Sequence, residues 1–281
     1  MWHSIYQSEI LQCLLEQEQR FDESHLVGKN RIALFDLDNT LIVGDIGDAV
    51  FAQLLVDGFS LLLTWKEYQR LCKENHHSAY MEVMRAMEGV TLEYIIQVSK
   101  RVLQSDRKFI VCEGERVRLP KPNLLMQEIV RLLRERHYSI FIVSASNDIS
   151  AKIAGSVLFD VPISNIAGIN PDLPDNKLTL NMFEPNPVGI GKVVHYHFMS
   201  GDRMPMIIAI GSALDIPLLH LCDPDGIAII VGQDPELYEK AKRELPTTVH
   251  LHRIPQLGFT VPAAAPRCLM NKQFLSSPAL V

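Results

Sequence analysis

The feature that most constrains the fold is a regular alternation of strand-like and helix-like segments between residues 120 and 255. Short apolar runs predict strands at 139–143, 166–169, 206–210, 226–231 and 248–251, and helical spacing predicts helices at 124–137, 148–159, 191–199, 214–222 and 235–245. Such alternation is typical of βαβ units, which build a parallel sheet with helices on both faces. Residues 31–36 form a further buried strand that ends in an acid, and 177–183 resembles one arm of a hairpin. The predicted fold class is therefore α/β, a Rossmann-like doubly wound parallel sheet.

A different pattern separates the first strand, at 31–36, from the alternating segments that begin at residue 120. Between residues 44 and 119, apolar residues recur at helical spacing and are punctuated by Gly58, Gly89 and Ser105. We expect an inserted all-helical domain here, which we call the cap. Ligands of doubly wound sheets bind beyond the carboxyl ends of the strands, so an insertion at this point covers the binding site.

These patterns predict four parts. A helical extension occupies residues 1–30, the α/β core 31–43 and 120–255, the cap 44–119, and an irregular, proline-containing tail 256–281.

Composition narrows the class of protein. The 281 residues carry a net charge of −6, and 21% are charged while 47% are hydrophobic, as in an ordinary globular protein. A basic, nucleic-acid-binding character is absent, and no apolar run approaches the ~18 residues of a membrane span. The five cysteines are scattered, and the N-terminus lacks a secretory pattern. We expect a cytoplasmic protein that binds neither nucleic acid nor membrane, and the sequence leaves its oligomeric state open.

The strongest chemical signal is the pair of carboxylates at Asp36 and Asp38. Asp is a poor strand former, and a buried carboxylate is costly without a partner. A strand end followed by an Asx turn at Asp38-Asn39 is the ordinary structural alternative. The chemical interpretation is phosphoryl transfer, in which one carboxylate attacks phosphorus and the other exchanges protons with the leaving group and water. A hard divalent cation such as Mg²⁺ would offset the repulsion between carboxylate and phosphate.

Asp36-Leu-Asp38-Asn-Thr40 matches the complete DxDxT motif of the haloacid dehalogenase (HAD) superfamily. Over residues 31–250 the sequence resembles the phosphoserine-phosphatase-like branch, which carries a helical cap after the first strand. The resemblance implies that Asp36 is the nucleophile and Asp38 the general acid/base, with the Asp38 backbone carbonyl on the metal. It also implies that Thr40 belongs to the phosphate-binding residues.

Two further motifs of the family have matches in the expected order. Ser144 follows the strand at 140–143, where a hydroxyl donates to a phosphoryl oxygen, and Lys192 stands at a helix start, where it neutralises nucleophile and phosphate. Alone, either residue could be an ordinary serine at a strand end or a solvated lysine.

The fourth motif is incomplete. The family has a Gly-Asp pair and a second Asp a few residues later, whereas this chain reads Gly211-Ser212-Ala-Leu-Asp215. Asp215 matches the second acid, but Gly211 or Ser212, depending on the alignment, stands where the first is expected. We assign Asp36, Asp38 and Asp215 to the metal, with Asp215 binding directly or through water.

Asp45 follows the nucleophile by nine residues, where the phosphoserine-phosphatase-like branch carries an acid that meets a substrate amine. The substrate could thus be amine-bearing, such as phosphoserine, phosphoethanolamine or phosphocholine. Trp65, Tyr68 and Tyr80 could surround a cationic group. The alternatives are that Asp45 caps the first cap helix and that the aromatic residues belong to the cap core.

The predicted function is Mg²⁺-dependent hydrolysis of a small phosphomonoester through an aspartyl-phosphate. Two alternatives stay open: a catalytically degenerate fold that binds a phosphorylated ligand or protein partner, and a phosphotransferase with an acceptor other than water.

Overall fold

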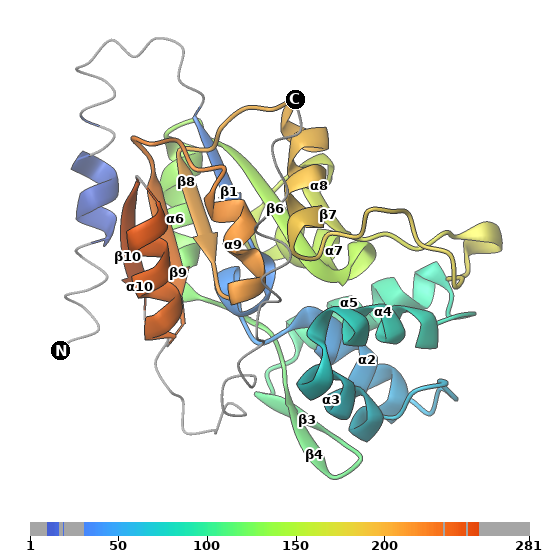
Figure 1. Cartoon of the computed structure of the whole chain (residues 1–281). Coiled ribbons are helices and arrows are strands. Elements are labelled where there is room, and N and C mark those ends of the chain that lie inside the picture. Colours follow the sequence, from blue (N-terminus) through green and yellow to red (C-terminus); the bar gives the residue numbers. More distant parts are fainter. Residues whose placement is uncertain (1–9, 17–18, 20–30, 233, 246, 253–281) are drawn as a thin grey trace.

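A computed structural model describes residues 10–16, 19, 31–232, 234–245 and 247–252 (Figure 1). The predicted tail at 256–281 and most of the N-terminal extension lie outside the described residues. Residues 10–16 are helical, and Ile10 and Leu14 pack into the main hydrophobic cluster of the core.

The centre of the core is a six-stranded, fully parallel sheet with the strand order β10-β9-β8-β1-β6-β7. Its strands are β1 (Ile32–Phe35), β6 (Ser139–Asn147), β7 (Ile166–Ile169), β8 (Ile207–Ile210), β9 (Ile227–Val231) and β10 (Thr248–His252). The strand order reverses direction at β1, which lies between β8 and β6. This point is where doubly wound sheets bind their ligands.

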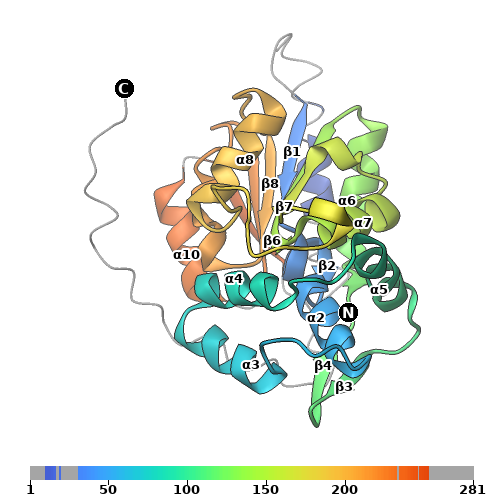
Figure 2. The same ribbon diagram turned by 90° about the vertical axis from the view of Figure 1, so that its right-hand side faces the viewer.

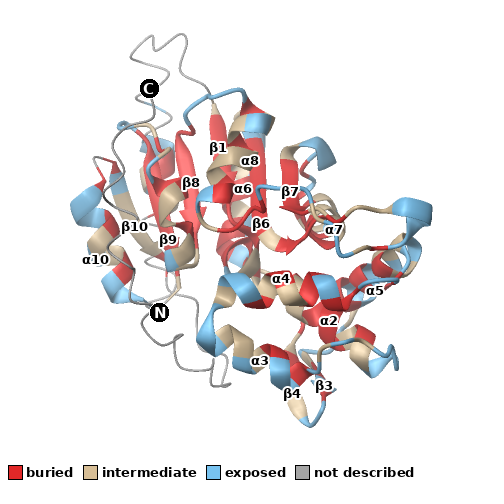
Figure 3. Cartoon of the chain, turned by 45° about the vertical axis from the view of Figure 1, so that its right-hand side comes forward, coloured by how far each residue is buried: buried red, intermediate tan, exposed pale blue. Residues whose placement is uncertain are grey.

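Both faces of the sheet are covered by helices, as the alternation predicts. One face packs against α6 (Leu124–Glu135) and α7 (Asp148–Phe159), and the other against α8 (Ile190–Ser200), α9 (Ile216–Leu219) and α10 (Pro235–Glu244). Alternate residues of β1 therefore belong to different clusters, with Phe35 on the first face and Leu34 on the second. Figure 3 shows the buried strands between these helices, and the predicted fold class is confirmed.

The cap contains four helices, α2 (Ile46–Val56), α3 (Trp65–Glu74), α4 (His76–Ala86) and α5 (Leu92–Gln104). It is not entirely helical, because β3 (Phe109–Cys112) and β4 (Glu115–Arg118) form an antiparallel hairpin at its end. The two turn residues, Glu113 and Gly114, both have positive φ, which suits a two-residue hairpin turn. Each strand has four residues, which is too short for its alternation to stand out in the sequence.

The chain passes from core to cap and back through two adjacent segments, β2 (Ile42–Val43) and β5 (Lys121–Pro122), which pair antiparallel. In Figure 2 the cap helices lie below the end of the sheet, and β2 is seen just above α2.

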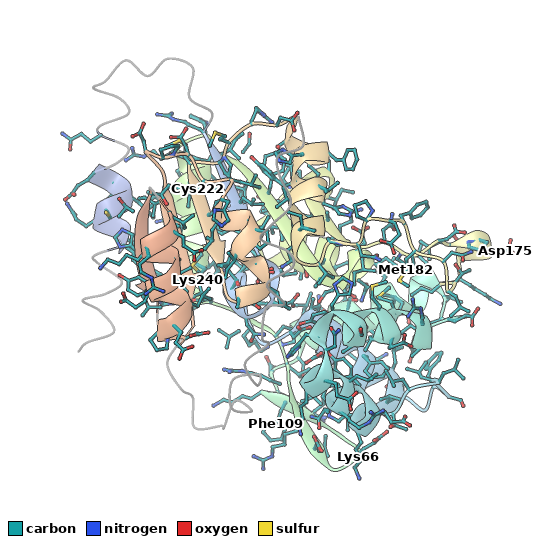
Figure 4. All side chains as sticks on the ribbon, viewed as in Figure 1. Lys66, Phe109, Asp175, Met182, Cys222 and Lys240 are labelled. Atoms are coloured by element: carbon teal, nitrogen blue, oxygen red, sulfur yellow. The ribbon has the colours of Figure 1, made fainter. Side chains whose placement is uncertain are left out.

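A long loop after β7 also approaches the cap. The segment 177–183 pairs antiparallel with 170–172, as the predicted hairpin arm requires, but irregularly and without forming a regular strand. Pro171 and Met182 form a bridge, Asp172 N donates to Asn181 O at 2.8 Å, and Phe183 N donates to Asn170 O at 3.0 Å. The beginning of this segment also pairs with the turn between α4 and α5: Gly89 N donates to Leu178 O at 2.8 Å, and Leu178 N donates to Val90 O at 3.0 Å. Figure 4 labels Asp175 and Met182 on this loop, beside the cap.

None of the described helices is long and apolar enough to cross a membrane.

Candidate active site

The candidate site begins in the turn that follows β1. Residues Leu37–Leu41 form a tight turn in which Asn39 has a φ of 55°, a conformation that Asn tolerates better than most residues. Asn39 and Gly44 close the turn, since Asn39 N donates to Gly44 O at 3.0 Å. Asp36 N donates to Ala209 O in β8 at 3.0 Å, which fixes Asp36 at the carboxyl ends of β1 and β8.

Both carboxylate oxygens of Asp36 are held by predicted site residues. Lys192 Nζ donates to Asp36 Oδ1 at 2.7 Å, and Thr40 Oγ1 donates to Asp36 Oδ2 at 2.6 Å. Lys192, near the start of α8, also contacts Asp215 Oδ1 at 2.5 Å. Four residues from three separate motifs thus meet at one point, and the Asp36, Lys192 and Asp215 side chains are at most 5% exposed.

The electrostatics of this group are unusual for buried side chains. Burial alone would lower the pKa of Lys192, but the carboxylates of Asp215 and Asp36 outweigh it and the net shift is upward, so Lys192 is a fixed cation. Burial, opposed by Lys192 and reinforced by Asp36, raises the pKa of Asp215 to about 7. One ammonium therefore compensates two carboxylates only in part.

Asp38 faces a second set of donors. Ile46 N donates to Asp38 Oδ1 at 2.8 Å, and Ser144 Oγ and Ser146 Oγ donate to Asp38 Oδ2 at 2.7 and 2.8 Å. Both serines lie in the last part of β6, where its pairing with β7 shifts register between Val143 and Asn147, and both hydroxyls turn to Asp38. The predicted phosphate ligand Ser144 thus contacts Asp38 here, and Ser146, which the motif analysis left out, does the same.

The environment of Asp38 favours its protonated form. Burial raises its pKa well above the usual value, and the nearby charges of Asp45 and Asp36 raise it further, although the Ile46 and Ser144 hydrogen bonds oppose the shift. A carboxyl that keeps its proton near neutral pH can act as a general acid.

Asp45 caps the first cap helix, the alternative to a substrate-binding role. Its Oδ1 accepts from Asp48 N at 2.9 Å at the start of α2, and Ser146 Oγ lies 3.4 Å from the same oxygen. Of the aromatic residues, Trp65 and Tyr68 pack with Phe51 in the cap core.

The donor set fits Mg²⁺ through two carboxylates rather than three. Within the described residues no three His, Cys, Asp or Glu side chains are arranged to hold a metal ion, and the contribution expected from Asp38 is its backbone carbonyl rather than its carboxylate. Mg²⁺ is commonly held by one or two carboxylates together with substrate phosphate oxygens. Asp36 and Asp215, buried side by side and incompletely neutralised, match that requirement.

Packing distinguishes the two candidate positions of the missing acid. A Cβ on Gly211 would lie 2.6 Å from Thr40 Oγ1 and 2.7 Å from Asn39 O, so the chain is too close here for any side chain. Ser212 is half-buried, and its Oγ accepts from Leu214 N at 3.1 Å before the 3-10 turn Ala213–Asp215. Ser212 is therefore the residue beside the site where an acid could stand.

The geometry of the site agrees with the comparison of the sequence with family models. Residues 33–220 match the model of the haloacid dehalogenase-like hydrolases. The chain belongs to this family. That result confirms the family expected from the Asp36–Thr40 motif and the expected hydrolase class, and the matched range covers the site residues Asp36, Lys192 and Asp215. No curated protein matches the sequence.

Solved structures similar to this haloacid dehalogenase-like hydrolase confirm its fold. A protein of unknown function from Bordetella pertussis Tohama I has a TM-score of 0.60 and 18% identity, covering 79% of this chain and 98% of its own. The HAD family hydrolase t0658 from Salmonella enterica serovar Typhi has a TM-score of 0.52 and 17% identity, covering 80% and 68%. An apo phosphoserine phosphatase has a TM-score of 0.51 and 17% identity, covering 79% and 94%. The fold is thus shared with the phosphoserine-phosphatase-like branch.

Proposed function

We propose that this hydrolase cleaves a small phosphomonoester in a Mg²⁺-dependent reaction through a phosphorylated Asp36. The observation that carries the proposal is the meeting of Asp36, Thr40, Lys192 and Asp215 at the reversal point of the sheet, with the protonation-prone Asp38 two residues along the chain. A nucleophile, a fixed cation and a general acid are the components that phosphoryl transfer to a carboxylate requires.

In the first step, a carboxylate oxygen of Asp36 attacks phosphorus and the bond to the leaving oxygen breaks. Lys192 and Thr40 hold the two oxygens of Asp36 and so fix the direction of attack. Asp38, whose pKa is raised by burial and neighbouring charge, donates its proton to the departing alkoxide.

In the second step, Asp38 accepts a proton from water. The water oxygen bonds to phosphorus, the bond between phosphorus and the Asp36 oxygen breaks, and inorganic phosphate leaves, which restores the Asp36 carboxylate and the protonated Asp38. Bound Mg²⁺ would be held by Asp36, the Asp38 backbone carbonyl and Asp215, and would neutralise charge on the transferring phosphoryl group.

A second candidate function rests on Ser212. Because a hydroxyl stands where the family has an acid, the site has one carboxylate fewer for the metal, which favours a protein that binds a phosphorylated ligand without turning it over.

One experiment separates the two. Phosphate release is measured from a panel of phosphomonoesters, with and without Mg²⁺, for the wild type, Asp36→Asn and the control Asp202→Asn, whose side chain is 86% exposed. We expect turnover with Mg²⁺ in the wild type and the control and none in Asp36→Asn, because an amide does not attack phosphorus. Hydrolysis by Asp36→Asn at the wild-type rate would contradict the mechanism. Binding of esters without any turnover would support the second candidate.

A further inference from the structure

One residue outside the turn Leu37–Leu41 holds two successive carbonyl groups of that turn. Asn123 N donates to Leu41 O at 2.8 Å, and Asn123 Nδ2 donates to Thr40 O at 3.2 Å. Asn123 is 5% exposed, and Thr40 is completely buried. The backbone and the side chain of Asn123 thus fix the end of the turn that follows the proposed nucleophile, Asp36.

The Asn123 side chain makes this contact instead of capping its own helix. Asn123 is the N-cap residue of α6, a position where an Asn side chain usually accepts from the first turn of the helix, but it makes no such bond here. Asn75, the N-cap residue of α4, shows the usual arrangement, because its Oδ1 accepts from Ser78 N at 3.2 Å. The amide of Asn123 is therefore engaged by the turn rather than by α6.

A buried histidine orients the Asn123 amide. His252, at the end of β10, is 2% exposed, and its Nε2 lies 3.3 Å from Asn123 Oδ1. A carboxamide oxygen can only accept, so His252 Nε2 is the donor in this contact. The reversed amide would place its oxygen against Thr40 O, so the histidine selects the orientation that holds the turn.

Thr40 links this contact to the reacting group. Its Oγ1 donates to Asp36 Oδ2 at 2.6 Å, and a Cβ on Gly211 would lie only 2.6 Å from the same Oγ1. The Thr40 hydroxyl is thus confined by Asp36 and by the chain at the end of β8, while the Thr40 backbone is held by Asn123. A shift of this backbone would turn the Asp36 carboxylate away from its direction of attack.

Asn123 also occupies the junction between core and cap. Thr40 and Leu41 directly precede β2, which leads into the cap, and Asn123 directly follows β5, which returns from it. Any displacement of the cap reaches the core through these two chain ends. The bonds of Asn123 join the two ends on the core side and so keep Thr40 in place.

We infer that Asn123 is a positioning residue, oriented by His252, that holds the Thr40 backbone so that the Thr40 hydroxyl aligns Asp36 with phosphorus. Asn123 acts through Thr40 rather than on the substrate. The inference rests on the proposed function, because it assigns to Asn123 a part in aligning the attacking carboxylate.

The test measures kcat and KM for p-nitrophenyl phosphate at saturating Mg²⁺ in the wild type, Asn123→Ser and the matched control Asn75→Ser. Serine is also a good N-cap residue, so both variants keep a capping side chain, but at position 123 the shorter side chain does not reach Thr40 O. In Asn123→Ser we expect kcat to fall by about tenfold to a hundredfold, because misplacing reacting groups by about 1 Å has effects of this size. KM should stay within about twofold, since alignment rather than binding is lost. Asn75→Ser should keep both constants.

A double variant shows whether Asn123 acts through Thr40. Thr40→Ala removes the hydroxyl and should itself lower kcat. In the Thr40→Ala background, Asn123→Ser should lower kcat by no more than about twofold further, because the hydroxyl that Asn123 positions is already absent. A further fall as large as the one that Asn123→Ser causes alone would overturn the inference.

Two substitutions of His252 test the orientation of the amide. Gln at this position can still donate to Asn123 Oδ1, whereas Leu cannot. His252→Leu should therefore lower kcat with KM unchanged, and His252→Gln should retain more of the wild-type kcat. Wild-type kcat in His252→Leu, or equal losses in the two variants, would overturn the part assigned to His252.

Stability and structure separate positioning from a merely structural role. A lower Tm of Asn123→Ser without any change in kcat would mean that the residue only stabilises the fold, which refutes the inference and leaves the proposed function standing. If the wild type hydrolyses no ester, the proposed function fails, and crystal structures of the wild type and Asn123→Ser decide. Displacement of Thr40 Oγ1 from Asp36 Oδ2 in the variant would support the inference, and an unchanged contact at 2.6 Å would refute it.

Discussion

Replacing Lys192 by Met should destabilise the protein severely. The Lys192 side chain is 4% exposed and bridges Asp36 Oδ1 at 2.7 Å and Asp215 Oδ1 at 2.5 Å. Met fills a similar volume but leaves both buried carboxylates without their shared cation. Removing one partner of a buried ion pair costs roughly 3–5 kcal/mol. With about 2–4 °C per kcal/mol for a chain of this size, Tm should fall by roughly 6–20 °C.

The assay is thermal denaturation followed by circular dichroism in EDTA, so that no divalent cation replaces the lost ammonium. Lys152→Met is the control, because Lys152 Nζ contacts Asp148 Oδ2 at 2.6 Å but its side chain is 37% exposed. An exposed pair contributes about 0–1 kcal/mol, so this variant should lose only a few degrees. Equal Tm values for the two variants would refute the view that Lys192 neutralises the buried carboxylates.

Three further changes test neighbouring features. Asp45→Asn keeps a helix cap but removes an acid whose pKa is raised to about 8. Because the folded wild type holds this proton more tightly than the unfolded chain, its free energy of unfolding should fall by up to about 1.4 kcal/mol per pH unit as pH rises from about 5 to 8. Tm measured across this range should therefore decline less steeply in the variant, and parallel declines would contradict the argument. Gly211→Asp should cost about 1–3 kcal/mol or more in urea denaturation, because its Cβ would lie 2.6 Å from Thr40 Oγ1, and unchanged stability would show that this contact relaxes. Ser212→Asp should lower the Mg²⁺ concentration for half-maximal activity because it adds a carboxylate, and an unchanged Mg²⁺ requirement would mean that Asp215 already completes the metal site.

Much of the fold could be predicted from the sequence because its signals are local. The helix at Asp148–Phe159 and the strand at Ile166–Ile169 have the predicted bounds, since apolar periodicity and capping residues mark their ends. The cap hairpin at 109–118 could not be recognised, because four-residue strands give too short an alternation. The segment 177–183 forms the expected antiparallel pairing with 170–172, but its second pairing, with the distant turn between α4 and α5, could not be predicted because no local pattern reveals it.

The candidate site likewise contains residues that the sequence could predict and residues that it could not. Asp36, Asp38, Thr40 and Lys192 could be named because each lies in a motif with a fixed place in the chain. Ser146 could not be placed with the same certainty, because the irregular end of β6 between Val143 and Asn147 brings its hydroxyl to Asp38 beside that of Ser144.

The measurement that tests the central claim most directly is the location of the phosphoryl group on the enzyme. Asp38→Asn removes the base that the second step requires, so a phosphorylated enzyme should accumulate when the variant is mixed with substrate and Mg²⁺ and quenched in acid. Mass spectrometry of the digested protein should then find one phosphoryl group on Asp36, and none when Asp36→Asn is added to the same variant. A phosphoryl group on another residue, or an equal amount in the double variant, would contradict the account.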